Sequence, residues 1–296
     1  MTGAPWRRRA WRRCALGVAS AAATGAACLD FSTNPDEFAA IELRPFPSPA
    51  VVAGDTLRDS LGQVAPLEAV VFDGSGDPVE APVEFIARDT LVTVTATGLA
   101  VAKDSVDGVS EILASTVGLQ SAVRRLDVVP RPDSLEASGT IDTLRWVIPD
   151  APATNVSTAL RVRLLNRTAS GVQAVRSWVV RFRLEFRGVP VPPDDTSLVY
   201  LVGETGQPSS VDTTDVQGFA SRRVRLRSGP GLSALDSAVV FVEAQHRGAP
   251  VAGAPVRLVV PMVPQAAPAA AGRAADSRAE WGAPSATAAS LRRLPE

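Results

Sequence analysis

The chain has 296 residues, enough for about two domains, and its composition of 46% hydrophobic and 21% charged residues is typical of packed globular domains rather than of a disordered polymer. Five arginines precede the first acid, Asp30, so removal of residues 1–27 would leave 25 basic against 31 acidic residues. This acidic balance predicts no nucleic-acid partner, because phosphate binding needs a concentrated basic surface.

Residues 1–27 have the pattern of a signal peptide. The basic stretch "MTGAPWRRRAWRR" is followed by the apolar, Ala-rich stretch "CALGVASAAATGAA". This apolar stretch is shorter than the roughly 20 residues of a transmembrane helix. The two cysteines of the chain are Cys14 and Cys28, so the sequence after the leader has no further thiol for a disulfide, a metal site or a nucleophile.

The end of the leader resembles the lipobox of bacterial lipoproteins. Ala26, Ala27 and Cys28 match that pattern, while Gly25 stands where leucine is usual. The resemblance implies that Cys28 carries a diacylglyceryl group and an N-acyl chain such as palmitate, which together suffice for stable membrane anchoring. It also implies the outer membrane, because Leu29 is not the aspartate of proteins retained in the inner membrane. The departure at Gly25 leaves two alternatives open, which are plain secretion and an uncleaved anchor.

The sequence of residues 39–263 is typical of β structure. Residues 28–38 form a short polar tether, and residues 39–130 contain short strands such as "LEAVVFD" and "LVTVTATGLAVA", separated by turns at roughly 8–12-residue spacing. Residues 131–139 are predicted to be a linker, and residues 140–263 a second β-sandwich. In that region "WVVRFRLEF" alternates strictly, with Val180, Phe182 and Leu184 on the face opposite to the arginines. The Ala- and Pro-rich residues 264–296 are predicted to be a disordered tail.

Several short motifs resemble bacterial immunoglobulin-like domains of the invasin and intimin type. In the first region these are "VVFDGSGDPVEAPVEF", "LVTVTATGLAVA" and "ILASTVGLQSAV". In the second, Thr214, Asp215, Gly218 and Ala220 form a "TD-x-x-G-x-A" segment that leads into a strand. The resemblance implies an all-β protein with two immunoglobulin-like β-sandwich domains. Such modules serve as spacers, stalks or adhesive units on bacterial surfaces.

Motifs for catalysis and for metal binding are missing from the sequence. The single histidine, His246, lies before a turn, and no P-loop, "G-x-S-x-G" or "H-E-x-x-H" pattern occurs. The carboxylate pairs are Asp194 with Asp195, Asp212 with Asp215, and Asp73 with Asp77. All lie in turn-like sequence, where aspartate is favoured by its bonds to nearby backbone N–H groups. We therefore predict no enzymatic activity, no cofactor and no metal site.

The arginines suggest a binding surface. Seven of them alternate with apolar residues on predicted strands of the second region: Arg161, Arg163, Arg181, Arg183, Arg223, Arg225 and Arg227. If these strands are neighbours, one sheet face would be basic and could bind an acidic glycan or another polyanion. The alternative is a solvated strand face balanced by nearby acids.

The sequence thus predicts a bacterial envelope protein that is anchored in the outer membrane by lipid at Cys28 and serves as a structural spacer or protein-binding module. The alternative function is an adhesin that binds acidic glycans through the arginine-rich face of the second domain. Its partners would be the membrane, through the anchor, and surface proteins or glycans.

Overall fold

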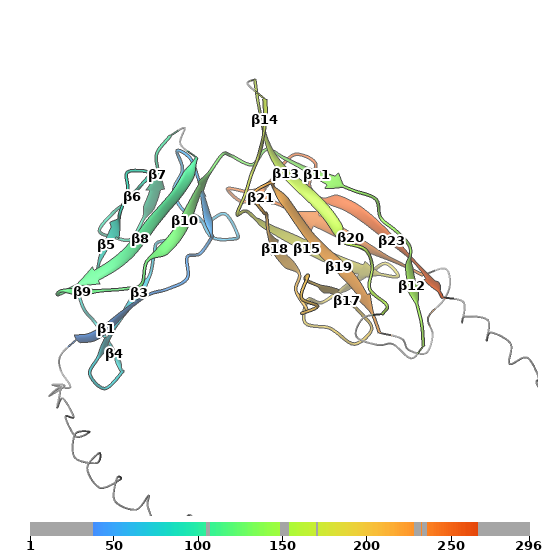
Figure 1. Cartoon of the computed structure of the whole chain (residues 1–296), viewed down its shortest axis with the longest axis horizontal. Helices are drawn as coiled ribbons and strands as arrows, with labels where there is room; N and C mark the ends of the chain where they lie inside the picture. The colour runs from blue at the N-terminus through green and yellow to red at the C-terminus, as the bar shows by residue number, and fades with distance from the viewer. Residues whose placement is uncertain are drawn as a thin grey trace, which may run out of the picture.

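The computed structural model describes residues 38–104, 107–148, 154–169, 171–227, 232 and 236–265. Their regular structure consists of β-strands, which form two sandwiches joined by the chain that follows β10 (Figure 1). None of these residues belongs to a helix that could cross a membrane. The predicted signal peptide and Cys28 lie outside the described residues, as do all but the last residue of the predicted tether over 28–38 and all but the first two of the predicted tail over 264–296. Phe38 belongs to β1 and Pro264 to β23, so each of these two boundaries is one residue off.

The first sandwich is built from short strands that enclose an aliphatic core. Its strands are β1 (Phe38–Leu43), β2 (Ala50–Val52), β3 (Ala69–Asp73), β4 (Pro78–Val79), β5 (Glu84–Ala87), β6 (Val92–Val94), β7 (Ala100–Ala102), β8 (Gly108–Thr116), β9 (Leu119–Gln120) and β10 (Arg124–Val129). One sheet has the order β2-β10-β8-β5, and opposite it lie β1-β3-β4 and the ribbon β6-β7. Leu57, Ile112 and Leu126 are completely buried between these layers.

The second sandwich has two larger sheets. Its strands are β11 (Ser134–Ser138), β12 (Leu144–Trp146), β13 (Leu160–Thr168), β14 (Gly171–Ala174), β15 (Val179–Phe186), β16 (Val189–Val191), β17 (Val199–Val202), β18 (Val211–Thr213), β19 (Phe219–Leu226), β20 (Ser237–Glu243), β21 (Gln245–His246), β22 (Ala249–Pro250) and β23 (Val256–Pro264). One sheet has the order β11-β13-β19-β17, and the other has the order β12-β23-β20-β15-β16. In addition, β14 pairs with β13, and β18 pairs with β15.

This strand order is that of an immunoglobulin fold. When the strands are lettered in chain order, the sheet β11-β13-β19-β17 consists of strands A, B, E and D, and the strands β23-β20-β15 are G, F and C. The first strand switches sheets, because β12 continues from β11 but pairs in parallel with β23. The first sandwich contains a sheet with the same arrangement as β12-β23-β20-β15. In it, β2 runs parallel to β10, and β8 and then β5 follow. The predicted all-β, immunoglobulin-like architecture is confirmed.

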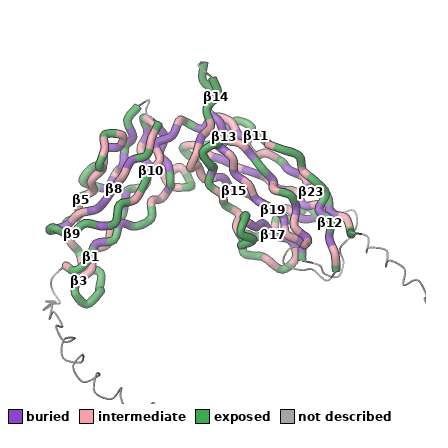
Figure 2. The backbone as a smooth tube through the Cα atoms, viewed as in Figure 1, coloured by how far each residue is buried: buried purple, intermediate pink, exposed green. Residues whose placement is uncertain are grey.

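Alternation of apolar and polar residues decides which face of each strand enters the core. In β15, Val180, Phe182, Leu184 and Phe186 are buried, while the residues between them point outward, as predicted. β19 alternates in the same way, and Figure 2 shows the buried positions along the inner strands of both sandwiches. Burying such a continuous apolar face is the main source of stability for each sandwich.

The predicted linker over residues 131–139 is wrong in its extent. Ser134–Ser138 forms β11, which pairs with β13 and contributes the buried Leu135 to the second core. The sequence pattern does not reveal this strand, because only one of its five side chains is buried and no apolar alternation results. Val129 ends the first sandwich, so four residues, 130–133, connect the two. So short a connection favours a defined arrangement of the sandwiches.

The "TD-x-x-G-x-A" segment is a tight turn that leads into β19. The Asp215 carboxylate accepts hydrogen bonds from the backbone N–H groups of Gln217 and Phe219, at 2.8 and 2.9 Å. Gly218 has φ +80°, and a Cβ at this position would lie 2.6 Å from the carbonyl oxygen of Leu164. Both the left-handed backbone and the close approach therefore require glycine.

Replacing Gly218 with alanine is expected to destabilise the second sandwich by about 2–4 kcal/mol, from backbone strain and from overlap with a backbone atom that cannot move freely. Gly188→Ala is the matched control, because Gly188 also has positive φ, +75°, but has no atom within 4 Å of the new Cβ. It should cost only about 1 kcal/mol. Chemical denaturation of both variants measures the difference, and equal losses would contradict the role assigned to the close approach.

Candidate functional site

Five of the seven predicted arginines lie on one outer face of the second sandwich. Arg161 and Arg163 point outward from β13, Arg223 and Arg225 point outward from β19, and the Arg227 guanidinium lies over the outward-facing Tyr200 ring. β13 and β19 are hydrogen-bonded neighbours, so these arginines share the surface of one sheet. We call Arg161, Arg163, Arg223, Arg225 and Arg227 the arginine face.

Aromatic rings hold part of the arginine face in place. The guanidinium carbons of Arg161 and Arg163 lie 4.4 and 5.2 Å from the centre of the Phe219 ring, and that of Arg227 lies 5.5 Å from the Tyr200 ring. Contacts of this kind are typical cation–π interactions. They order the side chains, and Arg163 also donates its Nε–H to the Gln217 carbonyl at 3.1 Å. The terminal N–H groups of these guanidiniums are the ones that could bind an anion.

Arg181 and Arg183 belong to a different surface. Both project from β15, which lies in the other sheet of the sandwich. Arg183 is 3.3 Å from the Glu185 carboxylate and 3.9 Å from that of Glu243, so nearby acids balance its charge. The structure therefore separates these two arginines from the arginine face.

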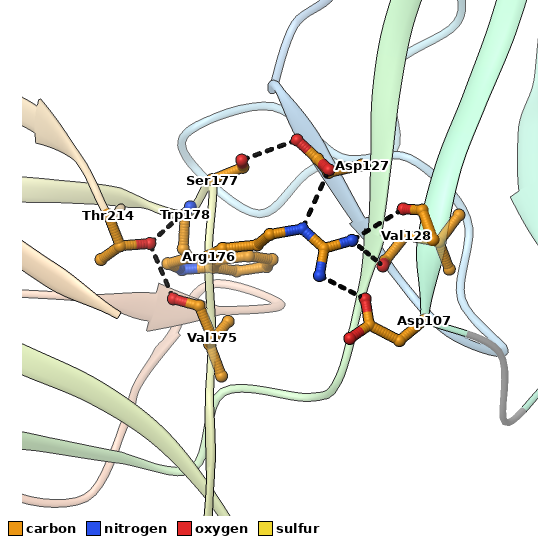
Figure 3. Close-up of polar contacts among 9 residues, drawn as sticks. Asp107, Asp127, Val128, Val175, Arg176, Ser177, Trp178 and Thr214 are labelled. Atoms are coloured by element: carbon orange, nitrogen blue, oxygen red, sulfur yellow. Dashed lines mark hydrogen bonds and ion pairs between the residues drawn. The ribbon is translucent and has the colours of Figure 1, made fainter. Parts of the chain in front are cut away.

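The junction between the two sandwiches is a second candidate site, and no sequence pattern pointed to it. Arg176 of the second sandwich reaches into the first, where its guanidinium lies 2.7 Å from the Asp107 carboxylate and 3.0 Å from that of Asp127 (Figure 3). It also donates to the Gly108 carbonyl at 2.9 Å, and the Ser177 hydroxyl donates to Asp127 at 2.6 Å. These contacts tie β8 and β10 to the segment that precedes β15.

The segment that carries Arg176 is itself fixed to the second sandwich. The buried Thr214 hydroxyl donates to the Val175 carbonyl at 2.7 Å and accepts the Trp178 backbone N–H at 2.9 Å (Figure 3). This explains the threonine of the "TD-x-x-G-x-A" motif, which bridges two neighbouring stretches of chain. Because Arg176 is held in place in the second sandwich and bonded to the first, it restricts movement of one sandwich relative to the other.

A second set of contacts surrounds the buried Asp55 of the first sandwich. Its carboxylate receives hydrogen bonds from Arg247 of the second sandwich at 2.8 Å and from Arg58 at 3.2 Å. Burial raises the pKa of Asp55, but the hydrogen bonds from the two arginines outweigh this effect and hold the pKa well below its usual range. Nearby, Arg181 donates to the Ser60 hydroxyl at 2.7 Å, also across the junction.

His246 lies at the same junction beside a small cavity of about 40 Å³ lined by residues of both sandwiches. Its Nδ1 atom is buried and has no hydrogen-bond partner among the described residues. Burial is the main cause that lowers the pKa of His246. The charges of Arg131, Arg247 and Arg58 lower it further, whereas Asp55 opposes them. The imidazole is therefore neutral at neutral pH, and protonation would add a cation to a cationic environment.

Acidification is expected to weaken the folded protein in the range where this histidine titrates. A folded-state pKa below the unfolded value of about 6.5 stabilises the protein fully above that pH, and this contribution is lost as the pH falls through the folded pKa. Melting curves at about pH 7.5 and 5.5 should show a lower melting temperature at the acid pH. His246→Gln should flatten this dependence, since the chain has a single histidine. An unchanged slope in the variant would refute the assignment.

At least one member of each carboxylate pair noted in the sequence is engaged in local structure. Asp73 accepts backbone N–H groups from Ser75 and Asp77 at 2.8 and 3.0 Å, and Asp212 accepts the Ser221 N–H at 2.7 Å and pairs with the buried Arg222 at 3.0 Å. Asp195 accepts the Ser197 N–H at 2.9 Å. Within the described ranges, no three His, Cys, Asp or Glu side chains gather in a group that could hold a metal ion.

Comparison with solved structures gives remote similarities. The Yersinia pseudotuberculosis adhesin InvE is 17% identical over 75% of this chain, with a TM-score of 0.29, and the matched part spans 58% of the length of InvE. The D0-D1 domain of Intimin is 13% identical over 76% of this chain and 98% of that structure, with a TM-score of 0.25. Domains 4 and 5 of the S-layer protein SbsC are 11% identical over 78% of this chain and 100% of theirs, with a TM-score of 0.27. No family model and no curated protein matches the sequence.

Proposed function

We propose that this protein is a non-enzymatic module of the bacterial cell envelope, in which two immunoglobulin-like sandwiches form one rigid spacer that presents binding surfaces. The observation that carries the proposal is the junction, where Arg176 and Arg247 each form ion pairs with the first sandwich. Such contacts between consecutive domains favour a fixed arrangement, whereas a flexible linker would leave each sandwich to orient independently. Loops and sheet faces would then be held away from the point of attachment.

Envelope location is tested by labelling an introduced cysteine in cells. Val216→Cys places a thiol at a position that is 79% exposed, and the mature sequence offers one other cysteine, Cys28. A membrane-impermeant maleimide should modify position 216 either in intact cells or after the outer membrane is opened. The first result indicates an outward-facing protein and the second a periplasmic one. Modification only after the inner membrane is lysed would overturn the envelope assignment.

The anchor that we propose is lipid on Cys28, with the outer membrane as its location. Support comes from the match of Ala26, Ala27 and Cys28 to the lipobox and from Leu29 after it. Intact-mass analysis of the membrane-extracted protein tests the proposal. A chain that begins at Cys28 and carries the mass of acyl groups is expected, and Cys28→Ser should abolish that mass. An unmodified chain beginning at Cys28 would replace the anchor with plain secretion.

The absence of catalysis is part of the same proposal. It is supported by the local hydrogen bonds of Asp73, Asp195 and Asp212, which hold these side chains to their own turns and strands. A glycosidase would instead need two carboxyl groups about 5–9.5 Å apart across a substrate cleft. Release of reducing sugar from envelope polysaccharides by the purified protein would overturn this part of the proposal.

A second candidate function is binding of acidic glycans, and the arginine face favours it. Five arginines gather on one sheet although the mature chain is acidic overall. Guanidinium groups bind carboxylates and sulfates through paired hydrogen bonds. The test is retention of the mature protein on an acidic glycan matrix, with elution by salt, against a neutral glycan matrix as control. Equal retention on both would count against this function.

A further inference from the structure

The arginine face is a single row. The register between β13 and β19 sets Arg163 opposite Phe219 and Arg161 opposite Ser221. Further along β19 the next outward positions are Arg223 and Arg225, and Arg227 follows two residues later. Outward-facing positions recur every two residues along the paired strands, and each such position in the row therefore carries one arginine. The first two arginines come from β13, the next two from β19, and Arg227 from the residue that follows β19.

The length of this row follows from strand geometry. Two residues of an antiparallel strand advance about 6.8 Å, so five consecutive outward positions extend over about 27 Å. Guanidinium groups at regular intervals along a line match a linear ligand with repeated anionic groups better than they match a compact anion. A single phosphate or carboxylate would use only one or two of the five arginines.

Two of the acids beside the row are engaged with other groups. Glu136, opposite Arg163 on β11, forms an ion pair with Arg167, which is not in the row. Asp212 pairs with Arg222, an inward-facing residue. Throughout the part of the chain that the structure describes, no ion pair is found for Arg161, Arg163 or Arg223. Arg161, Arg163 and Arg223 thus keep positive charge available for a ligand.

A polar groove of about 670 Å³ adjoins the row at Arg161, the row arginine that lines it, and supplies groups that suit sugar hydroxyls. Arg161 and Phe219 line it together with Thr205, Gln207 and Ser209. Guanidinium groups already cover the Phe219 and Tyr200 rings at 4.4 and 5.5 Å. The rings are therefore not open platforms for nucleobases, whose stacking is a main source of affinity for single-stranded nucleic acid.

We propose that the arginine row binds a linear acidic polysaccharide lengthwise, with its carboxylate or sulfate groups on the guanidinium groups and the hydroxyls of the sugars nearest Arg161 in the groove. This inference rests on the second candidate function and names its ligand class and binding mode. A lengthwise ligand makes more ion pairs as it becomes longer, until it covers the row. Affinity should accordingly rise with oligosaccharide length and then level off.

The test uses the mature chain with Cys28→Ser and oligogalacturonates of increasing length, with neutral galactan and single-stranded poly-dT as comparison ligands. Calorimetry should show affinity that rises with length to a plateau and weakens with salt. Arg161→Gln with Arg223→Gln should reduce affinity about tenfold, because two exposed charge contacts are worth about 1.4 kcal/mol together. Arg257→Gln is the matched control, since Arg257 is an exposed arginine on the outer face of the other sheet.

One further variant changes binding in the opposite direction. Glu204 lines the groove beside Arg161, and its carboxylate would repel an anionic chain. Glu204→Gln should therefore tighten oligogalacturonate binding about two- to threefold, as loss of one exposed like charge predicts. A purely structural role for the row would not produce a gain at this position.

The outcomes separate the inference from the function on which it rests. Binding that is independent of length, or that falls equally in Arg257→Gln, would overturn the lengthwise row while leaving acidic-glycan binding in place. Failure to bind any acidic glycan in the matrix assay or by calorimetry would overturn both. Binding of poly-dT more tightly than any oligogalacturonate would overturn the polysaccharide in favour of a nucleic acid.

Discussion

Replacing Arg176 with alanine is expected to uncouple the two sandwiches while leaving each of them folded. The side chain is 23% exposed, and it joins two carboxylates and two backbone carbonyls of the first sandwich. Its loss removes these contacts and leaves Asp127 with the Ser177 hydroxyl as its partner across the junction. Because hydrogen bonds to charged groups contribute about 1.5–3 kcal/mol each and this site is partly hydrated, we expect the coupling to fall by about 2–3 kcal/mol.

Calorimetry measures this uncoupling. The wild-type chain should unfold with the two sandwiches coupled, whereas Arg176→Ala should unfold in two separate transitions. Arg176→Lys should behave as an intermediate, because lysine keeps the charge but cannot bond two carboxylates with a planar fork. Arg257→Ala is the control on an exposed strand position. Identical thermograms for Arg176→Ala and the wild type would show that these ion pairs do not couple the sandwiches.

Replacing Gly62 with alanine is expected to push the sandwiches apart. Gly62 lies on the first sandwich against Arg247 and Gly248 of the second, and a Cβ at this position would lie 2.0 Å from the Gly248 nitrogen. Since the obstacle is backbone of the other sandwich, relief requires movement at the junction rather than a rotamer change. That movement would also separate Arg247 from the buried Asp55, whose hydrogen bond is 2.8 Å long.

Gly118→Ala controls for the backbone strain of the Gly62 variant. Gly118 lies in the first sandwich with φ +84°, close to the +81° of Gly62, but has no atom within 4 Å of the new Cβ. Both variants should therefore lose about 1 kcal/mol of local stability. Only Gly62→Ala should change the small-angle scattering profile, towards a more extended particle. An unchanged profile for this variant would contradict the close packing at the junction.

The architecture could be predicted from the sequence where residues alternate. The pattern of Phe182 and Leu184 against Arg181 and Arg183 gave the correct inner and outer faces of β15, because side chains of a strand alternate by geometry alone. Turn residues such as Gly218 were recognised as well, although the reason for the glycine, the Leu164 carbonyl, became visible only in three dimensions.

Other features could not be predicted because they depend on which strands become neighbours. β13 and β19 pair although more than fifty residues separate them, and this pairing brings Arg161 near Arg223 while leaving Arg181 in the other sheet. The junction was missed for the same reason. Arg176 lies outside any alternating pattern, and its partner Asp127 belongs to another domain, 49 residues away along the chain.

The central claim is that the two sandwiches form one rigid unit, and a distance distribution between them tests it most directly. Spin labels at Val101→Cys on β7 and Arg257→Cys on β23 report on separate sandwiches in the mature chain with Cys28→Ser, which has no other cysteine. Pulsed electron paramagnetic resonance should give one narrow distribution, which broadens in Arg176→Ala. A broad distribution in the otherwise unchanged chain, equal to that of the Arg176 variant, would contradict the claim.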